Sequence, residues 1–407
     1  MSMEMTRAKD INARKISKLE FKESKLSSFS KESSLETSYR VYRGDMVGIY
    51  YHIGIIEDEE GYAKAAMNLV RERPYPFALE TGKRARDKRE KVLTDQELRT
   101  AAESCMKYLT DNYPKFRFEM NFQGTEQDRR TTNSLGMDYR HQDYAVDVHV
   151  SFKHEESKDI IDGGFSFSLR TFDETIFRRM ADLYLANYEK EASLPEELII
   201  DTQYYGVVGQ VGYGLNGEEL ARGTSLLAGK IGEKVFSEDF TLEHDATDEE
   251  SWFNTFWDGD GCVFENDKLL LVEKGVLKTG FADKKTAKKY GIAHTGPAYH
   301  NFTDVPGPGG LNLRIRRSDK TIKELLNGRY AILPLSSTSS GFNEKGETTM
   351  VISRSLLYDG EGIVGRLPEF KVTTSMFDMF GKDFIGVGSD NPITYNDKQI
   401  LYRVHAI

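Results

Sequence analysis

The chain has 407 residues, 39% of them hydrophobic, and contains 23 Phe and 21 Tyr. This composition excludes a disordered chain, and the length predicts two domains that each bury a core. A formal net charge of −10 argues against a nucleic-acid partner, because phosphate binding needs a basic face. Two cysteines, Cys105 and Cys262, are too few for a disulfide framework or a thiolate zinc site. No secretory signal and no bilayer-spanning apolar run are visible, so a cytoplasmic location without membrane contact is expected.

The first elements in chain order are a tail, a hairpin and a helix. Residues 1–34 are basic and rich in serine, which predicts a flexible N-terminal segment. From residue 35, alternating apolar side chains on both sides of Gly44 predict a β-hairpin. Helical spacing predicts a helix that begins near Asp58 and ends at Pro74. Its apolar positions are Ala63, Ala66, Met67 and Val70. The basic cluster 83–91 is interpreted as the solvated face of a helix.

A second helix, a strand pair and a third helix come next. Thr94 and Glu97 form a capping box that starts the second helix, and Pro114 lies after its end. Residues 115–156 alternate like antiparallel strands, and residues 172–192 form an amphipathic helix. The core face of the later strand is expected to carry Val146, Val148, Val150 and Phe152. The opposite face, interpreted as hydrated rather than metal-binding, carries His141, Asp143, Asp147 and His149.

Beyond Pro195 the pattern changes to short strands separated by glycine turns. These strands are expected within residues 267–281, 309–317, 328–335 and 348–368. The predicted fold class is therefore α+β with two domains. Residues 35–194 form an N-terminal domain with an antiparallel sheet and helices, and residues 195–407 form a β-rich domain of the sandwich or barrel type.

Two segments imitate ligand-binding motifs. Gly212, Gly214 and Gly217 have G-x-G-x-x-G spacing, but the hairpin-rich sequence after them lacks the βαβ context of a dinucleotide site. The segment from Asp258 begins like an EF-hand loop, but Cys262 occupies a position that needs an oxygen ligand. A turn without calcium is predicted there.

Three blocks of the second half resemble, in order, the C-terminal blocks of the TldD/TldE family, whose members are often labelled PmbA or modulators of DNA gyrase. They span residues 232–250, 258–299 and 358–390, and the pattern LLxVExGVLKxxxxDxxTAxxxGxxxTG in the middle block is the most specific part. In the first half, residues 41–66 and 131–152 also resemble the family's first domain. The resemblance therefore covers nearly the whole chain after residue 35.

The resemblance implies a zinc-peptidase frame without its zinc ligands. TldD-type members carry H-E-x-x-x-H, then R-R-G-T-S and G-E-K-V, and this chain has VGQVGYGLNG, ARGTS and GEKV. Val208 and Tyr213 stand where the two zinc histidines belong, and Gly209 stands where the general-base glutamate belongs. The family's third ligand is a cysteine near the C-terminus, and residues 384–407 contain none. The glycines are interpreted as a remnant of the metal helix that keeps a relaxed, irregular backbone.

The segment after this remnant is expected to pack on the second domain. Residues 220–235 are interpreted as helix-like, with four apolar side chains buried against the sheet of the second half. These side chains are Leu220, Leu226, Leu227 and Ile231.

The resemblance implies a non-catalytic, TldE-like subunit of a zinc peptidase complex that acts on unfolded peptides. No catalytic, metal-binding or cofactor-binding residue is then expected in this chain, and zinc would reside in a catalytic partner. The expected partners are a TldD-type catalytic subunit, a second copy of this chain, or both. One alternative is a homodimeric metallopeptidase with a rearranged metal site. Its candidate ligands are His244, His294 and His300, although the sequence beside His294 and His300 offers no carboxylate or cysteine to complete a set. The other alternative is a peptide-binding interaction protein without a catalytic partner.

Overall fold

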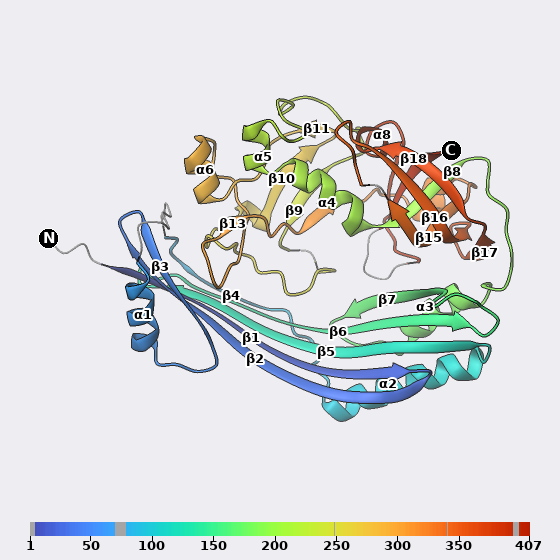
Figure 1. Ribbon diagram of the computed structural model, residues 1–407, viewed down its shortest axis with the longest axis horizontal. Helices are drawn as coiled ribbons and strands as arrows, with labels where there is room; N and C mark the ends of the chain where they lie inside the picture. The colour runs from blue at the N-terminus through green and yellow to red at the C-terminus, as the bar shows by residue number, and fades with distance from the viewer. Residues whose placement is uncertain (1–4, 70–78, 248, 340, 394–398) are drawn as a thin grey trace.

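The computed structural model describes residues 5–69, 79–247, 249–339, 341–393 and 399–407 (Figure 1). The helices are α1 (Asp58–Met67), α2 (Asp95–Asn112), α3 (Glu174–Leu185), α4 (Tyr204–Gly214), α5 (Gly217–Arg222), α6 (Lys284–Tyr290), α7 (Ile322–Leu326) and α8 (Met376–Met379), with a 3-10 turn η1 (Glu265–Asp267). The strands of the first half are β1 (Thr6–Lys22), β2 (Lys25–Arg43), β3 (Met46–Ile53), β4 (Lys83–Asp87), β5 (Phe116–Asn133), β6 (Asp138–His154) and β7 (Gly163–Leu169). Those of the second half are β8 (Leu198–Gln203), β9 (Leu242–Asp245), β10 (Lys268–Glu273), β11 (Val276–Leu277), β12 (Ala298–Tyr299), β13 (Gly307–Pro308), β14 (Leu313–Ile315), β15 (Ala331–Ser339), β16 (Glu347–Tyr358), β17 (Ile363–Leu367), β18 (Phe370–Ser375), β19 (Phe384–Val387) and β20 (Gln399–Ala406).

One large sheet organises the first half of the chain. Its strands lie in the order β3-β2-β1-β5-β6-β4. Strand β7 also pairs with β6, along a later stretch of that strand than β4 does. The hairpins predicted around Gly44 and within residues 115–156 are confirmed as β2–β3 and β5–β6. In Figure 1 this curved sheet lies between α2, on one face, and the second half of the chain, on the other.

The prediction that residues 1–34 are flexible is wrong. β1 occupies the middle of the sheet and pairs antiparallel with β2 from Thr6 to Lys22, and with β5 from Ala8 to Phe21. Backbone hydrogen bonds to two neighbours hold this strand although few of its side chains are apolar. Composition alone therefore misled the prediction, because it carries no information about strand pairing.

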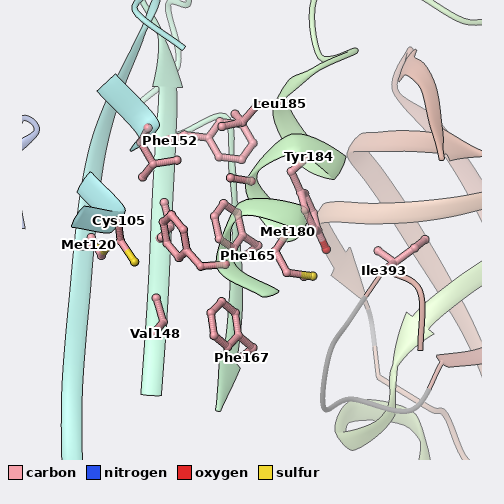
Figure 2. Packing of buried hydrophobic residues seen from close by; sticks show 14 of the residues in the cluster. Cys105, Met120, Val148, Phe152, Phe165, Phe167, Met180, Tyr184, Leu185 and Ile393 are labelled. Carbon is pink, nitrogen blue, oxygen red and sulfur yellow. The ribbon is translucent and has the colours of Figure 1, made fainter. Parts of the chain in front are cut away.

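The core of the first half lies between β5, β6 and β7 on one side and α2 and α3 on the other. The predicted core face of β6 is confirmed, since Val146, Val148, Val150 and Phe152 are all buried. The capping box of Thr94 and Glu97 at the start of α2 is confirmed as well. Figure 2 shows aromatic and sulfur side chains from the sheet and α3 filling this layer, and Ile393 of the second half belongs to the same cluster.

Helix α1 is present, but its buried face is not the predicted one. Gly61 and Ala65 are buried, whereas Ala63 and Met67 are exposed and Ala66 is half-buried. The helix approaches the sheet closely, because a Cβ on Gly61 would lie 2.6 Å from the Tyr39 ring. Small residues form this contact, so the apolar spacing pointed to the wrong side. Val70 and Pro74 lie outside the described residues.

The second half contains a closed five-stranded barrel and a smaller sheet. The barrel runs β15-β8-β20-β18-β16 and closes through the β15–β16 pairing. The small sheet has the order β11-β10-β9-β14. The fold class predicted from the sequence is confirmed, including a barrel in the second half. The predicted domain boundary at residue 195 lies in the connection between α3 and β8. Among the described residues, no helix is long and apolar enough to cross a membrane.

The helix-like segment predicted over residues 220–235 is shorter in the structure. Helix α5 ends at Arg222, where Gly223 takes a left-handed conformation with φ of 72°. Leu227 is fully buried, Leu220 and Leu226 are half-buried, and Ile231 is 46% exposed. Glycine termination explains the difference, because only glycine enters this conformation without strain.

The substitution Leu227→Asp should lower the free energy of unfolding by about 3 kcal/mol or more, because it buries an unpaired carboxylate in the second core, the buried apolar cluster of the second half that joins the barrel, α4 and the small sheet. Ile231→Asp, on the same segment but exposed, is the matched control and should change stability by less than about 0.5 kcal/mol. Urea unfolding followed by circular dichroism measures both. Equal midpoints for wild type and Leu227→Asp would contradict this assignment of the core.

Candidate functional site

Helix α4 and the start of α5 carry the three glycines whose spacing imitates a nucleotide loop. None of the three adopts a positive φ. A Cβ on Gly212 would lie 2.5 Å from the Leu313 side chain, and one on Gly214 would lie 3.2 Å from Leu227. A Cβ on Gly217 would lie 2.9 Å from the carbonyl oxygen of Phe281, which accepts a hydrogen bond from Gly217 N. The spacing therefore reflects close packing of a helix and a turn against the second core.

The three positions that the resemblance aligns with the zinc ligands and the base lie in different environments. Val208 is buried in the second core, together with Val211 and Leu215. Tyr213 is 64% exposed, and a Cβ on Gly209 would meet no atom within 4 Å. Helix α4 runs without interruption from Tyr204 to Gly214, so the expected irregular backbone is wrong. On a regular helix, residues five apart lie about 140° apart, which agrees with one buried and one exposed side chain.

Two of the candidate histidines, His244 and His300, line one small pocket of about 230 Å³ together with Arg129 and Trp257. The Nδ1 atom of His244 accepts a hydrogen bond from Asn312 N at 2.9 Å. The Nε2 atom of His300 lies 3.1 Å from the carbonyl oxygen of Trp257, to which it donates. Burial lowers the pKa of His244 to about 4 and that of His300 well below its usual value. Both rings are therefore neutral and already hydrogen-bonded.

The third candidate, His294, lies elsewhere. Its Nε2 atom is 3.9 Å from Cys262 Sγ, and Asp258 belongs to the same cluster. The inference that no carboxylate or cysteine lies near His294 is therefore wrong, because residues 258–262 fold back onto it. The three histidines do not converge, and this cluster is the one potential metal-binding group within the described residues.

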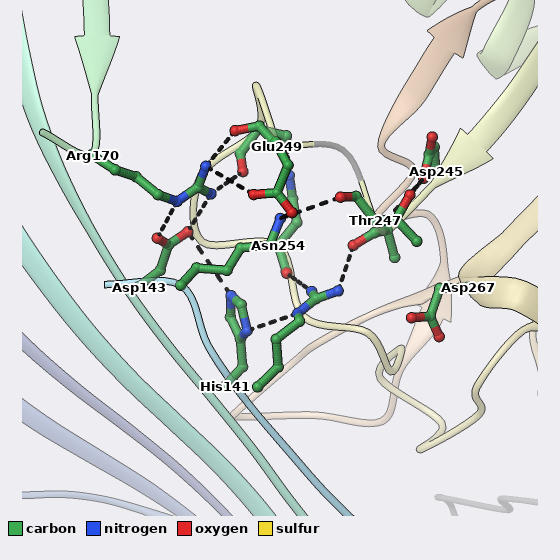
Figure 3. Close-up of polar contacts among 12 residues, drawn as sticks. His141, Asp143, Arg170, Asp245, Thr247, Glu249, Asn254 and Asp267 are labelled. Atoms are coloured by element: carbon green, nitrogen blue, oxygen red, sulfur yellow. Dashed lines mark hydrogen bonds and ion pairs between the residues drawn. The ribbon is translucent and has the colours of Figure 1, made fainter. Parts of the chain in front are cut away.

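On the face of the large sheet that meets the second half of the chain, arginine side chains bind groups of the second half (Figure 3). Arg86 donates to the carbonyl oxygens of Ala246 at 2.7 Å and Asn254 at 2.6 Å. Arg84 forms an ion pair with Asp267, with Nη1 and Oδ1 2.6 Å apart. Both arginines lie on β4, which pairs parallel with β6, so the interpretation of residues 83–91 as a solvated helix face is wrong. Pairing with a distant strand, which local charge spacing does not reveal, decides the conformation.

The contact between the large sheet and the second half of the chain also buries Asp143 and His141, which the sequence analysis placed on a hydrated face. Asp143 forms a two-point ion pair with Arg170, at 2.9 and 3.1 Å, and accepts a hydrogen bond from Phe253 N at 2.9 Å. Arg170 also donates to the Ser251 carbonyl oxygen at 2.8 Å. Residues 246–247 and 249–258 cover this end of the strand. Further along, Asp147 is half-buried and His149 is exposed, so the hydrated-face prediction is confirmed only for His149.

Two adjoining clefts separate the far end of the large sheet from the barrel. The larger has a volume of about 850 Å³ and the smaller about 480 Å³, and both are lined by Asp162, Leu335 and Arg354. The smaller cleft runs along β7 and β15. Within the described residues, β7 pairs only with β6, so its other edge is unpaired along this cleft.

No sequence pattern singles out Arg170 or these clefts, because both arise from contacts between segments far apart in the chain. The sequence holds one weak signal for this contact: Arg84 and Arg86 are two residues apart, which on a strand places both side chains on the same face.

Comparisons with known proteins agree with this architecture. The model of the PmbA/TldA metallopeptidase C-terminal domain matches residues 197–400. A protein named metalloprotease from Methanothermobacter thermautotrophicus is 26% identical over 240 residues, covering 56% of this chain and 51% of its own length. A metalloprotease TldD homolog from Buchnera aphidicola is 31% identical over 127 residues, covering 30% and 26%. The chain thus spans about half, or less, of the length of these relatives.

Solved structures match over almost the whole chain. TldE from Thermococcus kodakarensis superposes with a TM-score of 0.80 at 17% identity, covering 98% of this chain and 96% of its own. A protein from Thermotoga maritima described as a modulator of a DNA gyrase gives a TM-score of 0.79 at 17% identity, covering 99% and 96%. At this identity the likeness concerns the fold.

Acid should destabilise the protein through His141. Burial, and after it the nearby Arg86, lowers the pKa of this ring from 6.5 to about 3. Below pH 6.5 this histidine binds a proton in the unfolded chain but not in the folded chain. The free energy of unfolding therefore falls as the pH drops toward 3. The loss from this residue between pH 7.5 and pH 5 should be about 2 kcal/mol.

Urea unfolding at the two pH values tests this. His141→Gln should reduce the difference in unfolding free energy by that amount. His149→Gln, on the exposed part of the same strand, should leave it unchanged. An identical pH dependence in wild type and His141→Gln would contradict the buried neutral histidine.

Proposed function

We propose that this chain, which belongs to the PmbA/TldD metallopeptidase family, is a non-catalytic TldE-like subunit of a zinc-dependent peptidase complex. One observation carries the proposal: the α4 positions that correspond to the zinc ligands and the base are Val208, Gly209 and Tyr213. Valine offers no lone pair, glycine has no side chain and a neutral tyrosine is a poor ligand for zinc. Burial of Val208 adds to this, because its side chain faces the second core rather than a substrate.

In this proposal the zinc that serves peptide hydrolysis is held by a TldD-type partner. A catalytic zinc site normally uses three protein ligands and one water, and α4 supplies none of them. This chain would then contribute a rigid scaffold and part of the chamber wall. We expect a dimer, heteromeric or homomeric, in the cytoplasm, without direct contact to nucleic acid or membrane.

The clefts between the large sheet and the barrel are the proposed route for an unfolded peptide. The unpaired edge of β7 offers backbone donors and acceptors along the smaller cleft. An extended peptide can add to such an edge through main-chain hydrogen bonds, which demand little of its sequence. Arg354 and Asp159, an ion pair at 2.7 Å, both line the larger cleft, so its wall carries charges of both signs.

The homodimeric metallopeptidase is less well supported. His244 and His300 each use one ring nitrogen in a hydrogen bond and do not meet His294, which belongs to a separate cluster. A peptide-binding protein without a catalytic partner uses the same clefts, and only the partner distinguishes it from the proposed subunit.

Co-purification tests the proposal. The chain should form a stable complex with an H-E-x-x-x-H homologue from the same cell. Hydrolysis of an unfolded peptide should require the homologue, depend on chelatable zinc and be absent from this chain alone. Hydrolysis by the isolated chain would refute the non-catalytic role, and failure to bind any such homologue would favour the peptide-binding alternative.

The triple substitution Val208→His, Gly209→Glu, Tyr213→His should not create a peptidase. The first histidine would enter the core, the two histidines would lie on different sides of α4, and a third ligand would still be absent. Peptide hydrolysis far below the rate of the homologue is expected, since the third ligand is missing and the loss of outer-shell partners alone typically costs about 10- to 100-fold. Chelator-sensitive activity near the rate of the homologue would show that the frame alone suffices. The single change Gly209→Glu, at an open position, controls for folding.

A further inference from the structure

A mixed cluster of ligating side chains lies on the far side of the second half from the barrel, where the turn after Trp257 meets the loop that comes after α6. Its members are Asp258, Cys262 and His294, and one ligating atom of each lies within 4.8 Å of the others. The Cys262 Sγ and His294 Nε2 atoms are 3.9 Å apart. In a tetrahedral zinc site, ligand atoms are separated by about 3.5 Å, so small side-chain movements bring this set to bonding distance.

The backbone around the cluster is already ordered. Asp258 accepts hydrogen bonds from the N–H groups of Asp260 at 3.0 Å and Cys262 at 2.8 Å, and from that of Ala298 at 3.0 Å. These bonds fix residues 258–262 and tie them to the segment just after His294. A preformed turn of this kind lowers the entropy cost of gathering three ligands.

The chemistry of the donor set is specific. A thiol, an imidazole nitrogen and a carboxylate oxygen together favour a borderline metal such as Zn²⁺ over Ca²⁺ or Mg²⁺, which prefer oxygen alone. Glu80 Oε1 lies 3.5 Å from Cys262 Sγ, outside the three-residue cluster. The His294 side chain is 32% exposed and provides access from solvent.

The charges nearby are balanced for such an ion. Lys284 forms an ion pair with Glu80 at 2.9 Å, and Asp260 Oδ2 lies 3.9 Å from His294 Nε2. Burial raises the pKa of the Cys262 thiol and that of Asp258, the latter to about 6. A bound cation would offset the cost of burying both groups in their charged forms.

We propose that Asp258, Cys262 and His294 form a binding site for a zinc-type divalent metal, remote from α4. Cys262 binds as the thiolate, and its proton is released to solvent. The site joins the turn 258–262 to the loop after α6. This departs from the sequence-based expectation of a chain without metal, and it does not depend on the proposed peptidase role.

Cobalt titration of the full chain, stripped of metal and kept reduced, tests the site. One equivalent of Co²⁺ should bind with the absorption of a four-coordinate site and a thiolate-to-cobalt charge-transfer band, and Zn²⁺ should displace it. Cys262→Ser should abolish the charge-transfer band, and His294→Ala should weaken binding by at least about tenfold. Cys105→Ser is the matched control, because Cys105 is buried between α2 and the large sheet. This variant should change neither the charge-transfer band nor the affinity for Co²⁺.

A second measurement detects zinc at Cys262 in the wild-type protein. Zn²⁺ should slow alkylation of Cys262, followed by mass spectrometry, and should raise the melting temperature of wild type but not of Cys262→Ser. The proposal is overturned if cobalt binds without a thiolate band, if Cys262→Ser binds as tightly as wild type, or if no metal binds. Zinc that binds at α4 is measured on the Cys262→Ser variant, so that it is not confused with zinc at the Cys262 cluster.

Discussion

The buried ion pair between Asp143 and Arg170 is the contact on which the joining of the two halves depends. It lies on the face of the large sheet and holds residues 249–253 through three backbone groups. A buried pair of this kind costs desolvation energy, and that cost is offset only when every donor and acceptor is used. Here both carboxylate oxygens and all three guanidinium nitrogens have partners. Removing one member would leave the other charged and buried, which typically costs about 3–5 kcal/mol.

This contact also determines the path of the next residues in the chain. Residues 246–247 and 249–257 cover the face of β6 next to Arg84 and Arg86, and the chain then enters the turn that starts at Asp258. The turn carries Cys262 to His294, so the metal-binding cluster is built on a segment anchored by arginines of the other half. The clefts lie at the opposite end of the sheet, where Arg354 of the barrel donates to the Ile161 carbonyl oxygen just before β7, and apolar side chains of both halves share one core. The two halves are thus in contact at both ends of the sheet, and the clefts lie beside the second of these contacts.

The sequence predicted those features that local patterns encode. Alternation in residues 115–156 identified the hairpin and its core face, and Thr94 with Glu97 marked the start of α2. Prediction failed where a distant segment decides the outcome. The polar strand β1 is held by two neighbours, and His141 is buried by residues more than 100 positions away. His294 and Cys262 meet for the same reason, since their contact depends on a turn and a loop whose approach no local period describes.

The three glycines of α4 and the start of α5 show that packing alone can account for a motif-like spacing. Each closes a contact in which a Cβ would meet another segment: Leu313 for Gly212, Leu227 for Gly214 and a carbonyl oxygen for Gly217. These contacts belong to the second core and do not require zinc. Of the three positions that the resemblance assigns to catalysis, Gly209 faces open space and Tyr213 is exposed, whereas Val208 is buried in the same core. Packing therefore constrains the glycines and Val208, and it leaves positions 209 and 213 free to change. Packing in the second half is thus a sufficient cause for the glycine spacing, whether or not a metal binds nearby.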